Sequence, residues 1–221
     1  MTRSTTSAPA RQSRPRRAAL PLLAVLATIL TVAVPLSFPD DGGPNGWDRA
    51  VGKHIHTSLD GHRGVYDLLV APSNWYVVTP LLFAAVGWFA YRRRRLAAGF
   101  VLLAPELAMI VNTLLLKPFW DRPLHDYLAY PSGHTVHLVA IATAVALVSE
   151  SARVRVAVAV LLALILPLVL IGMTGLGYHH PTDVIGGTAA AIAMVTAAYL
   201  PIRARVLRAA RTGTPPPERN R

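Results

Sequence analysis

Six long apolar runs dominate this sequence of 221 residues and constrain its fold more than any other feature. A run of about 18 apolar residues is long enough to cross a bilayer as a helix. Apolar residues make up 53% of the chain and charged residues only 15%, against about 25% in a typical soluble domain. We therefore predict an all-α integral membrane bundle of six transmembrane helices, at residues 18–36, 75–91, 96–116, 135–148, 156–172 and 184–200. The fourth run is short, so its helix is expected to begin in the preceding loop.

The distribution of the cationic residues predicts the orientation of this bundle. Seventeen of the 22 Lys and Arg residues fall in the segments at the two ends and in alternate loops, and five fall in the other loops. Because positive residues gather on the cytoplasmic side, both termini are expected in the cytoplasm. The expected parts are a basic cytoplasmic tail at 1–17, a six-span membrane domain at 18–201 and a basic, disordered cytoplasmic tail at 202–221. The net charge of +11 is then a topology signal, and no nucleic-acid partner is expected.

Two segments near the N-terminus allow alternative interpretations. The first run follows Arg16 and Arg17 as a signal peptide would, but its length and the absence of an Ala-x-Ala pattern favour a retained span. In the outer segment 37–74, apolar residues recur at helical spacing from Trp47 to Leu59. This pattern predicts a short helix that either lies in the membrane interface or packs on the outer end of the bundle. Asn74, next to Ser73, is expected to cap the second span.

Candidate chemistry gathers on the outer side of this topology. All eight histidines lie there or at its boundary, and histidine is the side chain whose charge changes near neutral pH. The chain has no cysteine, which excludes disulfides, thiolate metal sites and a cysteine nucleophile.

The loop after the third span has the composition of a phosphate-binding site. Ser132, Gly133 and His134 stand where the fourth helix begins, and the free N–H groups of a helix start bind anions. Lys117 and Arg122 add two cations near the same membrane surface. A cluster of this kind suits the oxygens of a phosphoryl group. Taken singly, the serine is also an ordinary helix cap and the two cations an ordinary pair at the membrane surface.

The loop between the fifth and sixth spans offers a reactive histidine. His179 precedes Asp183 by four residues, and Asp183 is expected in the first turn of the sixth helix. A carboxylate there can accept the Nδ1 proton and leave Nε2 free as a nucleophile or base. Alternatively, Asp183 only stabilises the helix start.

Together these residues resemble the three motifs of the type 2 phosphatidic acid phosphatase superfamily. The matching positions are Lys117 with Arg122-Pro123, then Pro131-Ser132-Gly133-His134, then His179 with Asp183. The resemblance covers residues 96–200, and the earlier spans match in number and orientation.

The resemblance implies a histidine phosphatase that uses no metal or other cofactor. It implies that His179 attacks phosphorus and forms a phosphohistidine, that Asp183 orients it and that His134 protonates the leaving group. It also implies that the phosphate oxygens are held by Lys117, Arg122, Ser132 and Gly133.

The sequence departs from the family pattern in two places. Four residues separate Lys117 from Arg122, where the family usually has six. The serine and arginine of the third motif are replaced by Gly172 and Met173. The arginine normally clamps the phosphate, and its loss removes about 2–3 kcal/mol of transition-state binding. Arg63 and Lys53 on the outer face are candidates to replace it.

Two further residues have open roles. Glu106 lies in the middle of the third span, where burying a charged carboxylate costs free energy. Such a residue either marks a functional position or is protonated and bonded to a neighbouring helix. His137, one turn after His134, either lines the site or packs in the core.

These observations predict a multi-pass phosphatase of a bacterial cell membrane. Its expected partners are the bilayer and a lipid phosphate or pyrophosphate, such as undecaprenyl or another polyprenyl pyrophosphate or phosphatidate, met at the extracytoplasmic face. The alternative is a non-catalytic protein that binds lipid phosphates and has lost turnover with the third-motif arginine.

Overall fold

The computed structural model describes residues 14–212, and most of this range is helical. Its elements in chain order are α1 (Arg14–Ala33), η1 (Val34–Ser37), α2 (Gly46–Leu59), η2 (Asp60–His62), α3 (Arg63–Val70), η3 (Ala71–Ser73), α4 (Trp75–Tyr91), α5 (Arg95–Val111), η4 (Asn112–Leu116), α6 (Lys117–Trp120), β1 (Pro123–Leu124), β2 (Tyr127–Leu128), α7 (Gly133–Val148), α8 (Ala152–Gly175) and α9 (Pro181–Thr212).

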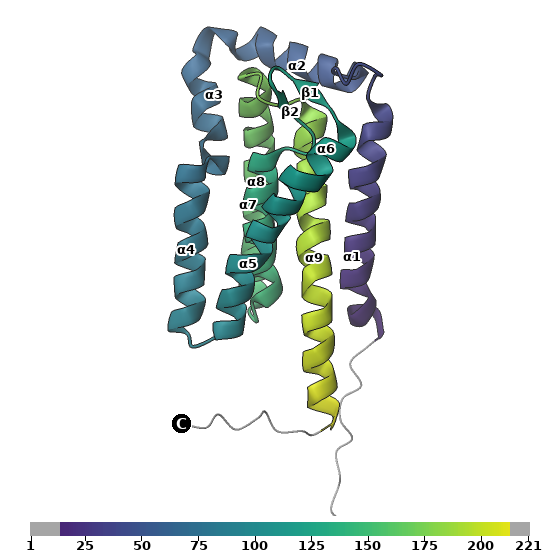
Figure 1. Ribbon diagram of the computed structural model, residues 1–221. Coiled ribbons are helices and arrows are strands. Elements are labelled where there is room, and N and C mark those ends of the chain that lie inside the picture. Colours follow the sequence, from purple (N-terminus) through teal and green to yellow (C-terminus); the bar gives the residue numbers. More distant parts are fainter. Residues whose placement is uncertain (1–13, 213–221) are drawn as a thin grey trace, which may run out of the picture.

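The six expected spans correspond to α1, α4, α5 with η4, α7, α8 and α9, which run side by side (Figure 1). Within residues 14–212, five helical runs are long and apolar enough to cross a membrane, and one of them, Gly46–Tyr91, joins α2 and α3 to α4. The remaining expected span, α7, is apolar but has only 16 residues. It begins at Gly133, in the loop before the fourth apolar run, as predicted.

The centre of the bundle is α7, which packs against α4, α5, α8 and α9. Its side chains Val136, Val139, Ala140 and Ala144 are completely buried. Small residues on α9 allow the two helices to approach closely, as is common between membrane helices. A Cβ atom at Gly187 would lie 2.7 Å from the carbonyl oxygen of Ser132, so this position requires glycine.

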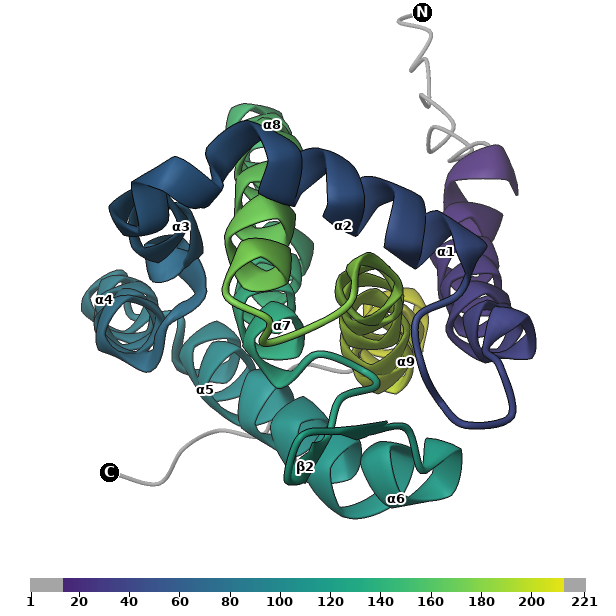
Figure 2. The same cartoon turned by 90° about the horizontal axis from the view of Figure 1, so that it is seen from above.

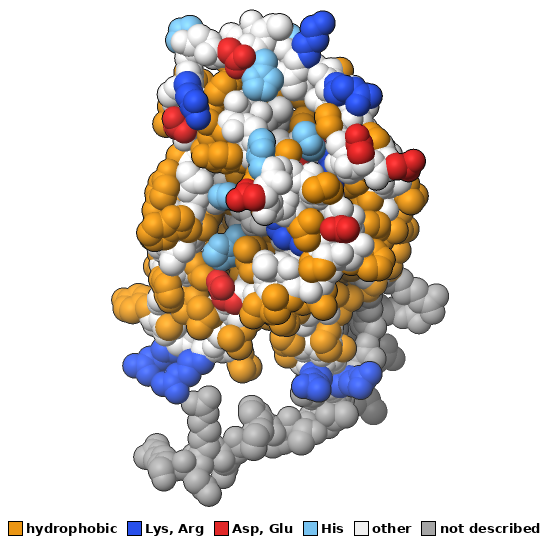
Figure 3. All heavy atoms as spheres, turned by 45° about the horizontal axis from the view of Figure 1, so that its top comes forward, with side chains coloured by type: hydrophobic (Ala, Val, Ile, Leu, Met, Phe, Trp, Pro, Cys, Tyr) orange, Lys and Arg blue, Asp and Glu red, His pale blue; other side chains and the backbone are white. Residues whose placement is uncertain are grey.

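The surface of the bundle is apolar around its middle. Leu22 and Ile29 of α1 and Leu164 of α8 each expose more than half of their surface. Figure 3 shows hydrophobic side chains as a broad belt on the visible face, with Lys and Arg side chains below it at the end opposite α2. Exposed apolar surface of this extent is typical of contact with lipid. The chain is therefore a multi-pass membrane protein.

A helical segment covers one end of the bundle. α2 lies across this end (Figure 2) and packs on α8 and α9, with its Ile55 buried, which selects the second of the two expected arrangements. Its start is fixed by a capping box, in which the Asn45 side chain accepts a hydrogen bond from the Asp48 N–H at 2.8 Å.

Two local predictions need correction. Asn74 stands at the N-cap of α4 but does not cap it, because its side-chain amide donates instead to the Tyr76 hydroxyl at 2.8 Å. The segment 202–221 was expected to be disordered, yet α9 continues to Thr212. Alanine and arginine, which dominate residues 202–212, are strong helix formers. The rest of that segment, and residues 1–13 of the expected N-terminal tail, lie outside the described residues.

Candidate active site

Four of the seven predicted site residues line one cavity at the end of the bundle that α2 covers, here called the main cavity. Its volume is about 590 Å³, and its walls include Lys117, Gly133, His134 and His179. Lys117 comes from α6, Gly133 and His134 from the start of α7, and His179 from the loop before α9. The fold thus brings together the two loops that the sequence analysis singled out.

His134 and His179 face each other across this cavity. Their ring centroids lie 6.2 Å apart and their planes are inclined by 75°. At this separation a single phosphoryl group can contact both imidazoles. The ring of Tyr127 lies 6.1 Å from that of His179, and its hydroxyl donates to the carbonyl of Tyr178. Burial raises the pKa of the Tyr127 hydroxyl, which therefore keeps its proton at neutral pH.

Asp183 lies in the first turn of α9, directly behind His179. The distance from His179 Nδ1 to Asp183 Oδ2 is 3.7 Å, which is an ion-pair distance but too long for a hydrogen bond. No other described group bonds to His179 Nδ1. The carboxylate itself is fixed, because Oδ2 accepts from the His180 N–H at 2.8 Å and Oδ1 from Arg122 at 2.7 Å. A hydrogen bond between the two requires the imidazole to move closer, and catalytic hydrogen bonds often tighten only with substrate bound.

The start of α7 lines the cavity at Gly133, and the first N–H groups of a helix have no partner within it. The Ser132 side chain, by contrast, is completely buried and does not line the cavity. Its hydroxyl accepts from Thr135 Oγ1 at 3.2 Å and lies 3.8 Å from the sulfur of Met173. Its N–H donates to the carbonyl of Asp183 at 3.0 Å. Ser132 therefore ties the start of α7 to the start of α9 from behind, which corrects the expectation of a hydroxyl in contact with phosphate.

Lys117 supplies the cation that faces the main cavity. It follows η4, a turn of π-helix, and such turns often occur at functional sites. Its ammonium group donates to the carbonyl of Leu128 in the β1–β2 hairpin, which holds the side chain in place. Within the same π-helical turn, Asn112 Nδ2 donates to the carbonyl of Pro131 at 3.3 Å. The turn thus positions both Lys117 and the loop that leads into α7.

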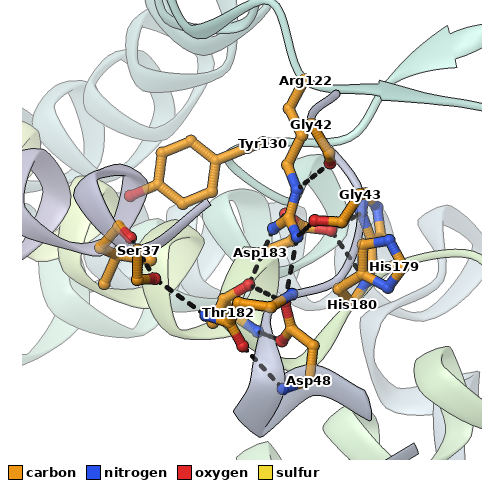
Figure 4. Close-up of polar contacts among 12 residues, drawn as sticks. Ser37, Gly42, Gly43, Asp48, Arg122, Tyr130, His179, His180, Thr182 and Asp183 are labelled. Atoms are coloured by element: carbon orange, nitrogen blue, oxygen red, sulfur yellow. Dashed lines mark hydrogen bonds and ion pairs between the residues drawn. The ribbon is translucent and has the colours of Figure 1, made fainter. Parts of the chain in front are cut away.

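Arg122 has a different role from the one predicted. Its side chain is completely buried and is absent from the lining of the main cavity. All five of its N–H donors are used (Figure 4): Nε donates to Gly42 O at 2.9 Å, Nη1 to Thr182 Oγ1 and Asp183 Oδ1 at 2.7 Å each, and Nη2 to Gly43 O at 2.9 Å and Asp48 Oδ2 at 3.0 Å. A guanidinium has five donors, so none is left for a phosphate. The prediction that Arg122 faces the phosphate is therefore wrong for this conformation, and the residue holds Asp183 instead.

Two residues of this buried cluster, Asp48 and Thr182, were not predicted from the sequence. Asp48 of α2 accepts from the Thr182 N–H at 2.9 Å and from the Thr182 hydroxyl at 2.8 Å. These contacts tie the helix that covers the bundle to the first turn of α9. The sequence holds a weak signal for Asp48, which stands off the apolar stripe of its helix. Nothing in the spacing connects it with Thr182, which is 134 positions away.

The third-motif positions are occupied by packing residues. Met173 is completely buried. A Cβ atom at Gly172 would lie 2.7 Å from the backbone nitrogen of Val70, so the close contact of α8 with α3 requires glycine there. Neither Arg63 nor Lys53 is among the described residues that line the main cavity. Lys117 is thus the one lysine or arginine of the described chain in that lining.

The fold and the cavity define a helical multi-pass membrane protein with paired histidines at one end. The model of the PAP2 superfamily matches residues 112–206, a range that contains all seven predicted site residues. The resemblance drawn from the motifs is therefore confirmed, and residues 112–206 form a PAP2 superfamily region.

A solved structure is similar to most of the chain: "Crystal structure of the first transmembrane PAP2 type phosphatidylglycerolphosphate phosphatase from Bacillus subtilis". The TM-score is 0.61 and the sequence identity 19%, over 86% of this chain and 98% of that one. No curated protein matches the sequence. At this identity the similarity establishes the fold.

Proposed function

We propose that this protein is a phosphatase that removes phosphate from a lipid at the extracytoplasmic face of the cell membrane. The observation that carries the proposal is the pair His134 and His179, which face each other across a cavity that also contains Lys117 and the start of α7. The sidedness rests on the arginines, because the cavity lies at the end of the bundle opposite the arginine-rich loops.

The geometry supports a two-step reaction. In the first step His179 Nε2 attacks phosphorus, the bond from phosphorus to the lipid oxygen breaks, and His134 donates a proton to that oxygen. Lys117 and the N–H groups at the start of α7 stabilise the charge on the remaining phosphate oxygens. In the second step water attacks the phosphohistidine and gives up a proton to His134, which releases inorganic phosphate and restores both histidines. Asp183 orients His179, and Arg122 and Ser132 hold the loops from behind.

A second candidate is a protein that binds lipid phosphates without turning them over. The observation that favours it is Met173, which occupies the place of the family's phosphate-clamping arginine and is buried. Candidate lipids for either function are phosphatidate, phosphatidylglycerol phosphate and polyprenyl pyrophosphates.

Phosphate release by detergent-purified protein from these lipids separates the two candidates. We expect the wild type to release phosphate and His179→Ala to lose at least about 1,000-fold in rate, because the variant lacks the nucleophile. Vanadate, which mimics the transferring phosphoryl group, should inhibit the wild type. His180→Ala serves as the control, since its imidazole is absent from the cavity lining. Equal, slow release by wild type and His179→Ala on every lipid would exclude the enzyme.

A further inference from the structure

The nucleophile of the proposed reaction lacks a close bond to the carboxylate that would orient it. His179 Nδ1 lies 3.7 Å from Asp183 Oδ2, and no group of the described residues bonds to it. The two residues whose roles the sequence left open are engaged with each other, since His137 Nε2 lies 3.1 Å from Glu106 Oε1. The His179 ring therefore needs another support, because a misplacement of about 1 Å can cost about 100-fold in rate.

Tyr127, which lines the main cavity, supports His179 at two points. Its ring stands edge to face with the imidazole, with the centroids 6.1 Å apart and the planes inclined by 73°, which is a favourable arrangement of two rings. Its hydroxyl donates to the carbonyl of Tyr178, which belongs to the peptide group that leads into His179. The first contact restricts the rotation of the imidazole, and the second fixes the main chain that carries it.

Tyr127 also neighbours the cation of the site. The ammonium nitrogen of Lys117 lies 5.9 Å from the centroid of the Tyr127 ring, within the range of a cation–π interaction. The same ammonium donates to the carbonyl of Leu128, the next residue of β2. Tyr127 thus stands between the imidazole that attacks phosphorus in the proposed reaction and the cation that binds the phosphate oxygens.

The place of Tyr127 in the fold is not that of a core residue. It belongs to a strand of two residues, where Leu124 of β1 is its partner, and it is 38% exposed. Substitutions at exposed positions usually change stability little. The hairpin also has a second attachment to the same loop, because His125 Nε2 lies 3.3 Å from the carbonyl oxygen of Gly177. The hairpin therefore keeps one attachment when Tyr127 is replaced.

We infer that Tyr127 is a positioning residue, which holds the His179 ring and the Lys117 ammonium in the arrangement that phosphoryl transfer requires. This inference rests on the proposed function and adds a residue to its site. Tyr127 acts through its neighbours, because its one hydroxyl proton is used on the Tyr178 carbonyl and none is left for a phosphate oxygen. Its replacement should therefore slow the reaction of bound substrate and leave the affinity for phosphate largely unchanged.

The test separates the two contacts of Tyr127 with two variants. Tyr127→Phe keeps the ring and removes the hydroxyl, whereas Tyr127→Leu removes both. Full-length proteins in detergent micelles are assayed on whichever of phosphatidate, phosphatidylglycerol phosphate and undecaprenyl diphosphate the wild type cleaves fastest. We expect kcat to fall by about three- to tenfold in Tyr127→Phe and by about 100-fold in Tyr127→Leu. The inhibition constant of inorganic phosphate should change by less than about threefold in both.

His125→Asn is the matched control. It alters the other attachment of the same hairpin to the same loop, and asparagine tolerates the positive φ of 54° at this position. We expect its kcat to stay within about twofold of the wild type, because His125 does not line the main cavity. The Tm of each variant is measured in the same micelles, and kcat is expressed per folded protein.

Each outcome has a distinct meaning. Equal kcat in the wild type and Tyr127→Leu overturns the inference and leaves the phosphatase intact. A Tyr127→Leu protein that loses phosphate affinity and Tm in step with kcat also overturns it, because that pattern marks a structural residue. So does an equal loss of kcat in His125→Asn, since attachment of the hairpin would then explain both. If folded wild type releases phosphate from none of the three lipids, the proposed function fails and the inference fails with it.

Discussion

Arg122 has five N–H donors, and the structure pairs each of them with a carbonyl, a hydroxyl or a carboxylate. Lys117 has the same charge but faces the cavity. The sequence placed both cations near one surface and predicted that both hold the phosphate. It could not distinguish their roles, because the partners of Arg122 lie 60 to 80 positions away in the chain. By contrast, Gly133 and His134 were predictable, since a helix start is a local feature.

The two cations should respond differently to mutation. Arg122→Met leaves Asp48 and Asp183 buried without their cation, which should lower the free energy of unfolding by about 3–5 kcal/mol. Lys117→Gln should leave the Tm nearly unchanged and lower kcat/KM about 100-fold, through lost stabilisation of the phosphate oxygens. Thermal unfolding in micelles and phosphate release, measured on both variants, check this contrast. An Arg122→Met protein as stable as the wild type would show that the buried cluster is not structural.

At the scale of helices, apolar length predicted the spans, since a bilayer admits few alternatives to a helix. The segment α2–α3 was harder to place, because its contacts are made with distant helices. Gly172 is an example. From the sequence, Gly172 was recognised only as a departure from a motif. The structure shows that the backbone of α3 packs against it, since a Cβ atom at this position would lie 2.8 Å from the Tyr66 carbonyl oxygen.

Gly172→Ala should therefore push α3 away from α8. We expect a loss of about 1–3 kcal/mol in stability, as for other overpacked contacts, because backbone atoms cannot turn aside as a side chain can. Gly87→Ala in α4 is the control, since no atom beyond the adjoining backbone of its own helix lies within 4 Å of its Cβ position and alanine favours a helix. The midpoint of thermal unfolding in micelles measures both changes. If the two variants unfold at the same temperature, the contact of α3 with α8 is looser than described.

For the whole molecule, the six apolar runs and the arginines predict the orientation in the membrane. Because the native chain has no cysteine, single cysteines introduced on either side can test this orientation. The first variant is Gly61→Cys, whose position lies in η2 at the end of the bundle that contains the cavity. We expect a membrane-impermeant maleimide to label it in intact cells. The same reagent should label Thr214→Cys, which follows α9, only after the cells are permeabilised. The opposite pattern would place the cavity in the cytoplasm and refute the proposed sidedness.

The short length of the central helix α7 affects how deep the cavity lies in the membrane. Sixteen residues rise about 24 Å, whereas the hydrocarbon of a bilayer is about 30 Å thick. When Val148 is placed at one boundary of the hydrocarbon, Gly133 lies several ångströms beneath the other. Under the proposed function, the reacting phosphorus is then drawn below the plane of the neighbouring headgroups. A water-soluble phosphate ester of the same chemistry, with no tail dissolved in the bilayer, must shed its hydration without a compensating anchor and should be a poor substrate.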